Sequence, residues 1–376
     1  MSSEYFLLSR LYPDYDQIYK YTFVHQRILE YRKRGFSPDV YRLRLGRPAS
    51  DHVFEDILCH TLPADAMAAR LSDSRYRVIL VHGLNEPIWR TIEPHIGGRP
   101  TLVWVHGTEI LDFRRRAYAY TTAKEQDVAE SQLNFWRGIL DPPLPNLKLV
   151  FVSRDAARQA MRDLRLDIPQ ANYAVVHNPI DVETFRYEPK SASQRKMILS
   201  IRPFKAVTYG NDMIVKTILR LARDEDFEEL RFTIVGDGPL FDEIVEPVRR
   251  FSNVHLIKRY LLHDEIAELH RQHGIFLIPT RADTQGVSRD EAMASGLVPV
   301  TNAIDAVPEF VSDDCGILAP PDDHEALAHG VRRLIEDPDL FGRMSLAASQ
   351  RVRAQSAAEI VTPQELELIT GRRWTR

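Results

Sequence analysis

Short runs of apolar residues recur along the chain, and longer amphipathic segments separate them. The first series comprises residues 5–9, 77–83, 101–107, 148–153 and 173–178. The second series comprises residues 197–202, 231–238, 254–260, 275–280, 297–301 and 316–320. Near-continuous apolar strands that alternate with helical patterns are typical of parallel sheets covered by helices on both faces. The pattern therefore predicts an α/β protein with two doubly wound, Rossmann-like domains in tandem.

A polar segment, "IDVETFRYEPKSASQRK", separates the two series and shows no sustained period. We therefore expect an N-terminal domain over residues 1–180, a linker over 181–196 and a C-terminal domain over 197–354. The tail, from about residue 355 to 376, is expected to pack back on the first domain. Ligands bind at the carboxyl ends of the strands in open α/β sheets, so we expect a cleft between the domains that both sheets face.

Composition narrows the class of protein. The chain has 376 residues, 44% of them hydrophobic, and a net charge of −4, so no overall basic field favours nucleic acid. Its two cysteines, Cys59 and Cys315, lie far apart, which argues against a disulfide framework and favours the cytoplasm. No run of about 18 apolar residues predicts a membrane span. A peripheral contact with the inner face of a membrane stays open.

Candidate chemistry concentrates in "DTQGVSRDEAMASGLVPV", residues 283–300, which follows a buried strand. A helix from Val287 to Ser295 would point its N-terminal N–H groups and positive dipole end at the loop, which suits a phosphate or hydroxyl oxygens. Gly286 would let a ligand approach the backbone, and Asp283 and Glu291 could accept hydrogen bonds from it. The alternative is purely structural, because Ser288 and Glu291 have the spacing of a capping box.

Several segments in a fixed order resemble a known family. They are "FVSRDAARQAM" (151–161), "VVHNPIDVETF" (175–185), "ILSIR" (198–202), "FTIVGDGPL" (232–240), residues 283–300 and "AVPEFVSDDCGILAPPDD" (306–323). Together they are similar to the retaining GT-B glycosyltransferases of the large nucleotide-sugar-dependent family with a Glu-x7-Glu motif, the family 4-like, group 1 glycosyltransferases. The resemblance implies the GT-B fold, with two Rossmann-like domains that face an interdomain cleft.

The resemblance also implies a set of site residues. Arg202, Lys205 and the helix start would bind the diphosphate of a UDP- or GDP-sugar, Glu291 would hold the ribose, and Asp283 would hold sugar hydroxyls. The catalytic set is then His106, Arg202, Lys205, Asp283 and Glu291. The donor-binding set is Asn178, Gly236, Gln285, Gly286, Val287 and Ser288.

Three positions leave alternatives. His106, in "TLVWVHGTEI", resembles the family's strand-end histidine, but His82 ends a similar strand. Lys205 stands at an unusual spacing after Arg202, and Tyr209 is the other occupant of the family's lysine position. An exposed ion-pair surface is the structural alternative for the two cations. Asp283 stands where the family has Glu, one methylene longer.

The function implied is a retaining, metal-independent hexosyltransferase (EC 2.4) that needs no cofactor besides its nucleotide-sugar co-substrate. Its acceptor would be a glycan or lipid-linked glycan, in bacterial surface polysaccharide or lipopolysaccharide synthesis. Retention would come from same-face attack, with the departing phosphate taking the acceptor proton. Two alternatives are a nucleotide-sugar epimerase of the same architecture and a non-catalytic binding protein with a degenerate site. The segment 112–120 interleaves arginines with aromatic residues and could face a lipid surface or be a solvated helix face.

Overall fold

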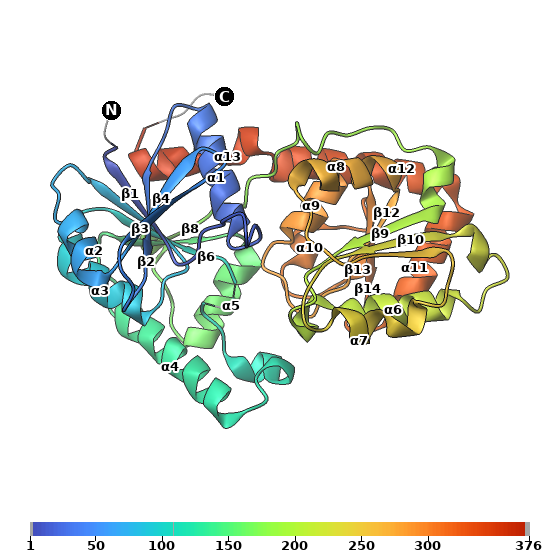
Figure 1. Cartoon of the computed structure of the whole chain (residues 1–376), viewed down its shortest axis with the longest axis horizontal. Coiled ribbons are helices and arrows are strands. Elements are labelled where there is room, and N and C mark those ends of the chain that lie inside the picture. The colour runs from blue at the N-terminus through green and yellow to red at the C-terminus, as the bar shows by residue number, and fades with distance from the viewer. Residues whose placement is uncertain (1–2, 108, 373–376) are drawn as a thin grey trace. The chain divides into compact units, whose positions relative to one another are not determined.

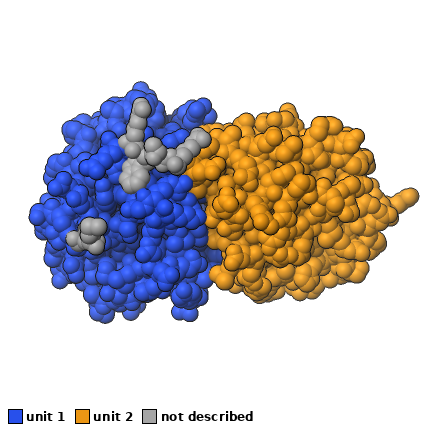
Figure 2. Space-filling model, turned by 90° about the horizontal axis from the view of Figure 1, so that it is seen from above, with its two compact units in different colours: residues 1–179, 361–376 blue, residues 180–360 orange. Residues whose placement is uncertain are grey.

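The computed structural model describes residues 3–107 and 109–372, which form two compact units. Unit 1 comprises the chain up to Pro179 together with the segment from Val361 onward, and unit 2 comprises Ile180–Ile360 (Figure 2). Residues 181–196, expected to be a linker, belong to unit 2. Residues 373–376 of the expected C-terminal tail lie outside the described residues.

Unit 1 is built on an eight-stranded sheet of order β3-β4-β2-β1-β5-β6-β7-β8, parallel except for the β3–β4 pair (Figure 1). Its strands are β1 (Tyr5–Ser9), β2 (Asp39–Leu43), β3 (Ser50–Phe54), β4 (Ile57–Leu62), β5 (Val78–His82), β6 (Thr101–Val105), β7 (Leu147–Phe151) and β8 (Tyr173–Val175). The apolar runs did not predict β2, β3 and β4. The edge strand β3 is largely exposed and β4 has two partly or fully exposed positions, so neither is a continuous apolar run.

Helices cover both faces of this sheet because alternate residues of each strand point to opposite faces. Phe6 and Leu8 of β1 pack with α2 (Ala64–Leu71), α3 (Glu86–Ile96), α4 (Ala123–Leu140) and α5 (Arg154–Leu164). Leu7 packs on the other face with α1 (Thr22–Lys33) and α13 (Ala358–Thr370). The last helix of the chain thus completes the core of unit 1.

Unit 2 contains a six-stranded, wholly parallel sheet of order β11-β10-β9-β12-β13-β14. Its strands are β9 (Met197–Ile201), β10 (Arg231–Val235), β11 (Val254–Ile257), β12 (Ile275–Leu277), β13 (Val298–Asn302) and β14 (Ile317–Ala319). Counted within the unit, this is the order 3-2-1-4-5-6 of a doubly wound nucleotide-binding sheet. The order reverses between β9 and β12, and the carboxyl ends of these two strands therefore mark the expected ligand position.

The helices of unit 2 also form two layers. They are α6 (Asn211–Leu221), α7 (Phe241–Val245), α8 (His263–Gln272), α9 (Val287–Ala294), α10 (Val307–Phe310), α11 (His324–Glu336) and α12 (Pro338–Gln355). One core cluster joins α6, α7 and α11 to Ile198 of β9, and another joins α8, α9 and α12 to Leu199 (Figure 1). Across the described residues, no helix combines the length and apolar character that a membrane span requires.

Candidate functional site

Arg202 follows β9 directly and is fixed by backbone carbonyl groups at the point where the strand order of unit 2 reverses. Its Nε donates to the carbonyl oxygen of Tyr209 at 3.2 Å, and its Nη2 donates to that of Pro279 at 3.4 Å. Burial lowers the pKa of Arg202, and the carboxylate of Asp283 opposes this shift. The guanidinium is therefore a cation held in one orientation beside the carboxyl end of β12.

Lys205 lies in the same loop and is exposed to solvent. Its Nζ lies 5.3 Å from the ring centroid of Tyr260, whose hydroxyl donates to the carbonyl oxygen of Asp237 at 2.9 Å. Tyr209, the alternative occupant of the lysine position, instead places its ring 5.4 Å from the Arg202 guanidinium. The loop thus presents two cations, and each is held against the face of a tyrosine ring.

Gly236 directly follows β10 and lies next to Arg202. A Cβ at this position would lie 1.9 Å from the carbonyl oxygen of Arg202, closer than any side chain can approach. Glycine is therefore required here, because the backbone after β10 lies against the backbone of Arg202 after β9. This structural role explains Gly236 without a ligand, and its predicted contact with a donor stays a prediction.

Asp283 lies in the loop that follows β12, and a buried arginine holds its carboxylate. Nη1 of Arg289 donates to Oδ2 of Asp283 at 3.0 Å. Burial raises the pKa of Asp283, while Arg289 first and Arg202 second oppose that shift. The ion pair with Arg289 therefore favours the ionised carboxylate in a poorly hydrated position.

Arg289 and Asp290 are site residues that the sequence interpretation missed. Both are 1% exposed, and Nη2 of Arg289 donates to Oδ1 of Asp290 at 2.8 Å. Gln285, also buried, donates from Nε2 to Oδ2 of Asp290 at 3.1 Å. A signal for them was present in the sequence. Arg289 and Asp290 stand directly before "EAMASG", a stretch of small and apolar residues that indicates a buried helix. Charged side chains in a buried helix need partners of opposite charge.

The capping-box alternative for Ser288 and Glu291 is wrong. Helix α9 begins at Val287 with Gly286 as its N-cap, and no side chain caps it. Ser288 is therefore already inside the helix. The Glu291 side chain, 11% exposed, has Oε1 at 3.6 Å from Nε2 of His263.

Gly286 packs closely on the acid loop. A Cβ there would lie 2.7 Å from Oδ2 of Asp283 and 2.9 Å from Nη1 of Arg289. The missing side chain thus makes room for the Asp283–Arg289 ion pair at the start of α9. The expectation that Gly286 admits a ligand to the backbone stays a prediction, as do the ligand contacts of Gln285, Val287 and Ser288.

His82 and His106 are the two candidate histidines; His82 ends β5, His106 directly follows β6, and the two side chains contact each other. Nδ1 of His82 lies 2.9 Å from Nε2 of His106, with the rings stacked at 17°. Burial lowers the pKa of both histidines well below the usual value, so both are neutral near pH 7. His82 is fully buried and stacks on Trp104, whereas His106 is partly exposed. This difference favours His106 for a ligand contact, and its contact with a donor sugar stays a prediction.

Asn178, a predicted donor-binding residue, is buried in unit 1 beside a fully buried ion pair. Its Oδ1 accepts from Nη2 of Arg27 at 3.2 Å, and Nε of Arg27 donates to Oε1 of Glu365 in α13 at 2.7 Å. Nε1 of Trp104 donates to the same carboxylate oxygen at 2.6 Å. These contacts give Asn178 a structural role, and its contact with a donor stays a prediction.

The basic and aromatic segment 112–120 contains the 3-10 helix η1 (Phe113–Ala119), and Arg114 and Arg115 have acidic partners. Arg114 forms ion pairs with Asp112 and Glu130, and Nε of Arg115 donates to Oδ1 of Asp163 at 2.8 Å. Arg116 is buried. The arrangement matches the solvated-face alternative better than a row of cations presented to a lipid surface.

Within residues 3–107 and 109–372, no group of three or more His, Cys, Asp or Glu side chains is arranged to hold a metal ion. Independence from metal and from a cofactor stays a prediction about the reaction.

Three comparisons relate this geometry to known proteins. Residues 195–337 match the family model of glycosyl transferases group 1. N-acetyl-alpha-D-glucosaminyl L-malate synthase of Bacillus anthracis is 26% identical over 208 residues, covering 52% of this chain and 53% of the relative. MMP alpha-(1->4)-mannosyltransferase of Mycolicibacterium hassiacum is 26% identical over 200 residues, covering 52% and 47%. The chain thus spans about half the length of the curated relatives it matches.

The fold is similar over the whole chain to a solved structure, Anabaena HepE in complex with UDP-glucose. The TM-score is 0.72 at 12% identity, with 98% of this chain and 100% of HepE covered. The prediction of two Rossmann-like domains is confirmed. The chain therefore has the GT-B fold, and the part of unit 2 that carries Arg202, Asp283 and Glu291 matches the group 1 glycosyl transferases.

Proposed function

We propose that this protein is a retaining glycosyltransferase that moves a hexose from a UDP- or GDP-sugar to a hydroxyl group of a glycan or lipid-linked glycan. The observation that carries the proposal is that Arg202 and Asp283 lie in the loops that follow β9 and β12, the two strands between which the strand order of unit 2 reverses. Lys205 lies in the same loop as Arg202, and the Asp283 carboxylate opposes the lowering of the Arg202 pKa. The family match covers all of these residues. The relatives named N-acetyl-alpha-D-glucosaminyl L-malate synthase and MMP alpha-(1->4)-mannosyltransferase support the same class, as does the similar fold of HepE, whose structure holds UDP-glucose.

The two cations would stabilise the leaving group. The diphosphate gains negative charge as the glycosidic bond breaks, and groups already aimed at that charge lower the barrier most. Arg202 is suited to this role because two backbone carbonyls fix it before any ligand binds. Lys205 and the N-terminal end of α9 would supply further positive potential. Removing one such contact should raise the barrier by about 3 kcal/mol.

Asp283 would orient the sugar. Its Oδ2 is engaged by Arg289, and we assign its Oδ1 to a sugar hydroxyl. The Asp283 carboxylate is held by Arg289, on a side chain one methylene shorter than that of Glu. It is therefore better suited to orienting the sugar and stabilising positive charge than to nucleophilic attack. Retention would then follow from same-face attack, with the departing phosphate accepting the proton of the acceptor hydroxyl. Glu291 would hold the ribose.

Ligand-dependent stabilisation tests the proposal. UDP, GDP and their hexose conjugates are added to the parent protein in a thermal-denaturation assay, in which a ligand at about 100 times its Kd stabilises by about 2.7 kcal/mol. We expect one nucleotide series to raise the melting temperature, and this rise to be lost in Arg202→Ala and Glu291→Ala. Arg220→Ala is the matched control, since Arg220 is a partly exposed arginine of α6 with acidic partners Asp224 and Glu325.

Turnover separates the proposal from its alternatives. With donor and acceptor present, nuclear magnetic resonance should show a product with the anomeric configuration of the donor. A nucleotide-sugar of changed configuration, formed without acceptor, would identify an epimerase instead. Binding without turnover at any acceptor would identify a degenerate site. If Arg202→Ala and Glu291→Ala respond to nucleotides like the parent, the site assignment is wrong.

A further inference from the structure

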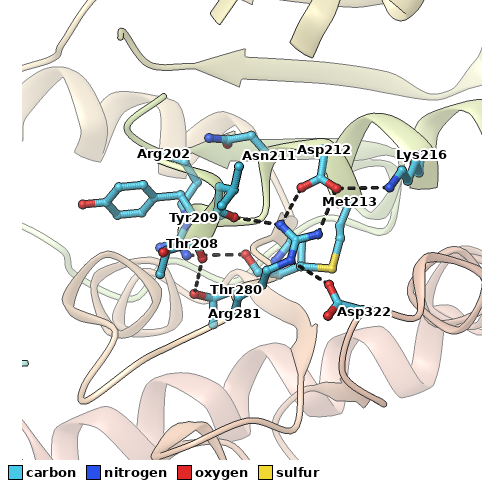
Figure 3. Close-up of polar contacts among 12 residues, drawn as sticks. Arg202, Thr208, Tyr209, Asn211, Asp212, Met213, Lys216, Thr280, Arg281 and Asp322 are labelled. Carbon is cyan, nitrogen blue, oxygen red and sulfur yellow. Dashed lines mark hydrogen bonds and ion pairs between the residues drawn. The ribbon is translucent and has the colours of Figure 1, made fainter. Parts of the chain in front are cut away.

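Arg281 lies two residues before Asp283, and its side chain makes polar contacts with several segments of unit 2 (Figure 3). Its Nη1 and Nη2 donate to Oδ1 and Oδ2 of Asp212 at 2.7 and 2.9 Å, a two-pronged contact with the first turn of α6. Its Nε donates to Oδ1 of Asp322, in the loop after β14, at 2.8 Å. One side chain therefore joins three separate segments of the unit.

The same residue also holds the turn between β9 and α6. The turn contains the short 3-10 helix η4 (Val207–Tyr209). The backbone N–H of Arg281 donates to the carbonyl oxygen of Thr208 at 2.9 Å, and its Nη1 donates to that of Val207 at 2.7 Å. The Thr280 hydroxyl adds a bond to the Thr208 carbonyl at 3.2 Å. Three hydrogen bonds from two consecutive residues thus fix this turn.

Arg202 approaches the same turn from the other side. Its Nε donates to the carbonyl oxygen of Tyr209, the residue next to Thr208 (Figure 3). Lys205 lies two residues before the turn. A movement of residues 207–209 would therefore displace the carbonyl group that orients Arg202 and would shift the chain next to Lys205.

The charge of Arg281 is already balanced by protein groups. Its side chain is 17% exposed, and each of its three nitrogens donates to a protein oxygen. Arg281 and Lys216 hold the pKa of Asp212 down at about 2, so this partner is ionised at all working pH values. An arginine satisfied in this way is poorly suited to bind a ligand phosphate itself, in contrast to the exposed Lys205.

We propose that Arg281 is a positioning residue that fixes the turn 207–209 and so preorganises Arg202 and Lys205 for a nucleoside diphosphate. The proposal rests on the proposed function and adds to it the element that holds the diphosphate-binding loop in place. Preorganised cations bind a diphosphate more tightly than mobile ones, because less order has to be imposed on binding.

The test compares a nucleoside diphosphate with its nucleoside by calorimetry. UDP and uridine, and GDP and guanosine, are titrated into the parent, and the pair that binds is then used for the variants. In Arg281→Lys and Asp212→Asn we expect the affinity for the diphosphate to fall by about tenfold or more while the affinity for the nucleoside changes less than about twofold. Arg281→Lys keeps the charge and loses the two-pronged geometry. Hydrogen exchange of the backbone amides of residues 204–211 should also accelerate in both variants without ligand.

Arg220→Met is the matched control, since it removes another arginine that bridges two carboxylates of unit 2. It should leave unchanged the ratio of the affinity for the nucleoside diphosphate to the affinity for the nucleoside. An unchanged ratio in Arg281→Lys and Asp212→Asn, together with a lowered ratio in Arg202→Ala, would overturn the role of Arg281 and leave the proposed function standing. An equal loss of nucleoside and diphosphate affinity would also overturn it, because the effect would then be on the whole unit. If neither diphosphate binds the parent, both proposals fail.

Discussion

Replacing Arg289 by methionine tests the buried charge cluster next to Asp283. The Arg289 side chain is 2% exposed, and its guanidinium contacts two carboxylates, those of Asp283 and Asp290, at 3.0 and 2.8 Å. Methionine keeps an unbranched, apolar side chain that can still pack near the ring of Phe310, which lies 5.2 Å from the guanidinium. The substitution therefore removes the positive charge and leaves the two carboxylates without it.

The expected effect on stability is large. Removing one partner of a buried ion pair reduces the free energy of unfolding by about 3–5 kcal/mol, because the remaining charge is buried without compensation. With a urea m-value of about 2 kcal/mol per M, the midpoint falls by about 1.5 to 2.5 M. Arg220→Met is the matched control, and an exposed pair of this kind contributes about 0–1 kcal/mol.

The sequence allows the two units to be followed separately. All four tryptophans lie outside residues 180–360, so tryptophan fluorescence reports the unfolding of unit 1. Far-UV circular dichroism reports both units. In Arg289→Met we expect the circular dichroism transition of unit 2 to move to lower urea, while the fluorescence transition stays near that of the parent.

The loss should also depend on pH. Burial raises the pKa of Asp283 above its unfolded value, and removing Arg289, which opposes that shift, raises it further. A raised carboxyl pKa means that the folded state binds a proton more readily, so stability is gained as pH falls through the raised pKa. The difference between variant and parent should therefore be largest near pH 7 and smaller at acidic pH. A loss below about 1 kcal/mol at pH 7 would refute the assignment of Arg289 as the compensating charge.

Three further predictions concern single positions. Gly236→Ala puts a methyl group 1.9 Å from a backbone carbonyl oxygen, so the free energy of unfolding of unit 2 should fall by about 1–3 kcal/mol. Urea denaturation followed by circular dichroism measures this loss, and an unchanged midpoint would contradict the geometry. Glu365→Gln leaves the buried Arg27 uncompensated and should lower the free energy of unfolding of unit 1, followed by tryptophan fluorescence, by about 3–5 kcal/mol, with unit 2 unaffected. Burial lowers the pKa values of His82 and His106, so the unfolded state binds more protons and unit 1 loses stability as pH falls below about 6.5. His82→Gln should weaken this pH dependence of stability. An equally steep stability profile in the variant would contradict the role of His82.

Much of the fold could be predicted from the sequence. Eleven apolar runs correspond to strands of the two sheets, because parallel strands covered on both faces require nearly continuous apolar sequence. The strands β2, β3 and β4 do not follow this rule and were missed. The helix at 287–294 was predicted at its observed start, whereas its N-cap was not, because capping depends on the backbone conformation around Gly286 rather than on the spacing of Ser288 and Glu291.

The sequence by itself determined the sheet of unit 2, five of the eight strands of unit 1, and the loops that contain Arg202 and Asp283, since periodicity and motif order are local properties of the chain. Only the tertiary structure decided which charges meet. Arg281 meets Asp212, 69 positions away, and Arg27 meets Glu365, 338 positions away. Burial makes an unpaired charge costly, so each buried ion must find a partner, but the chain's path through space, and not its spacing, determines which one.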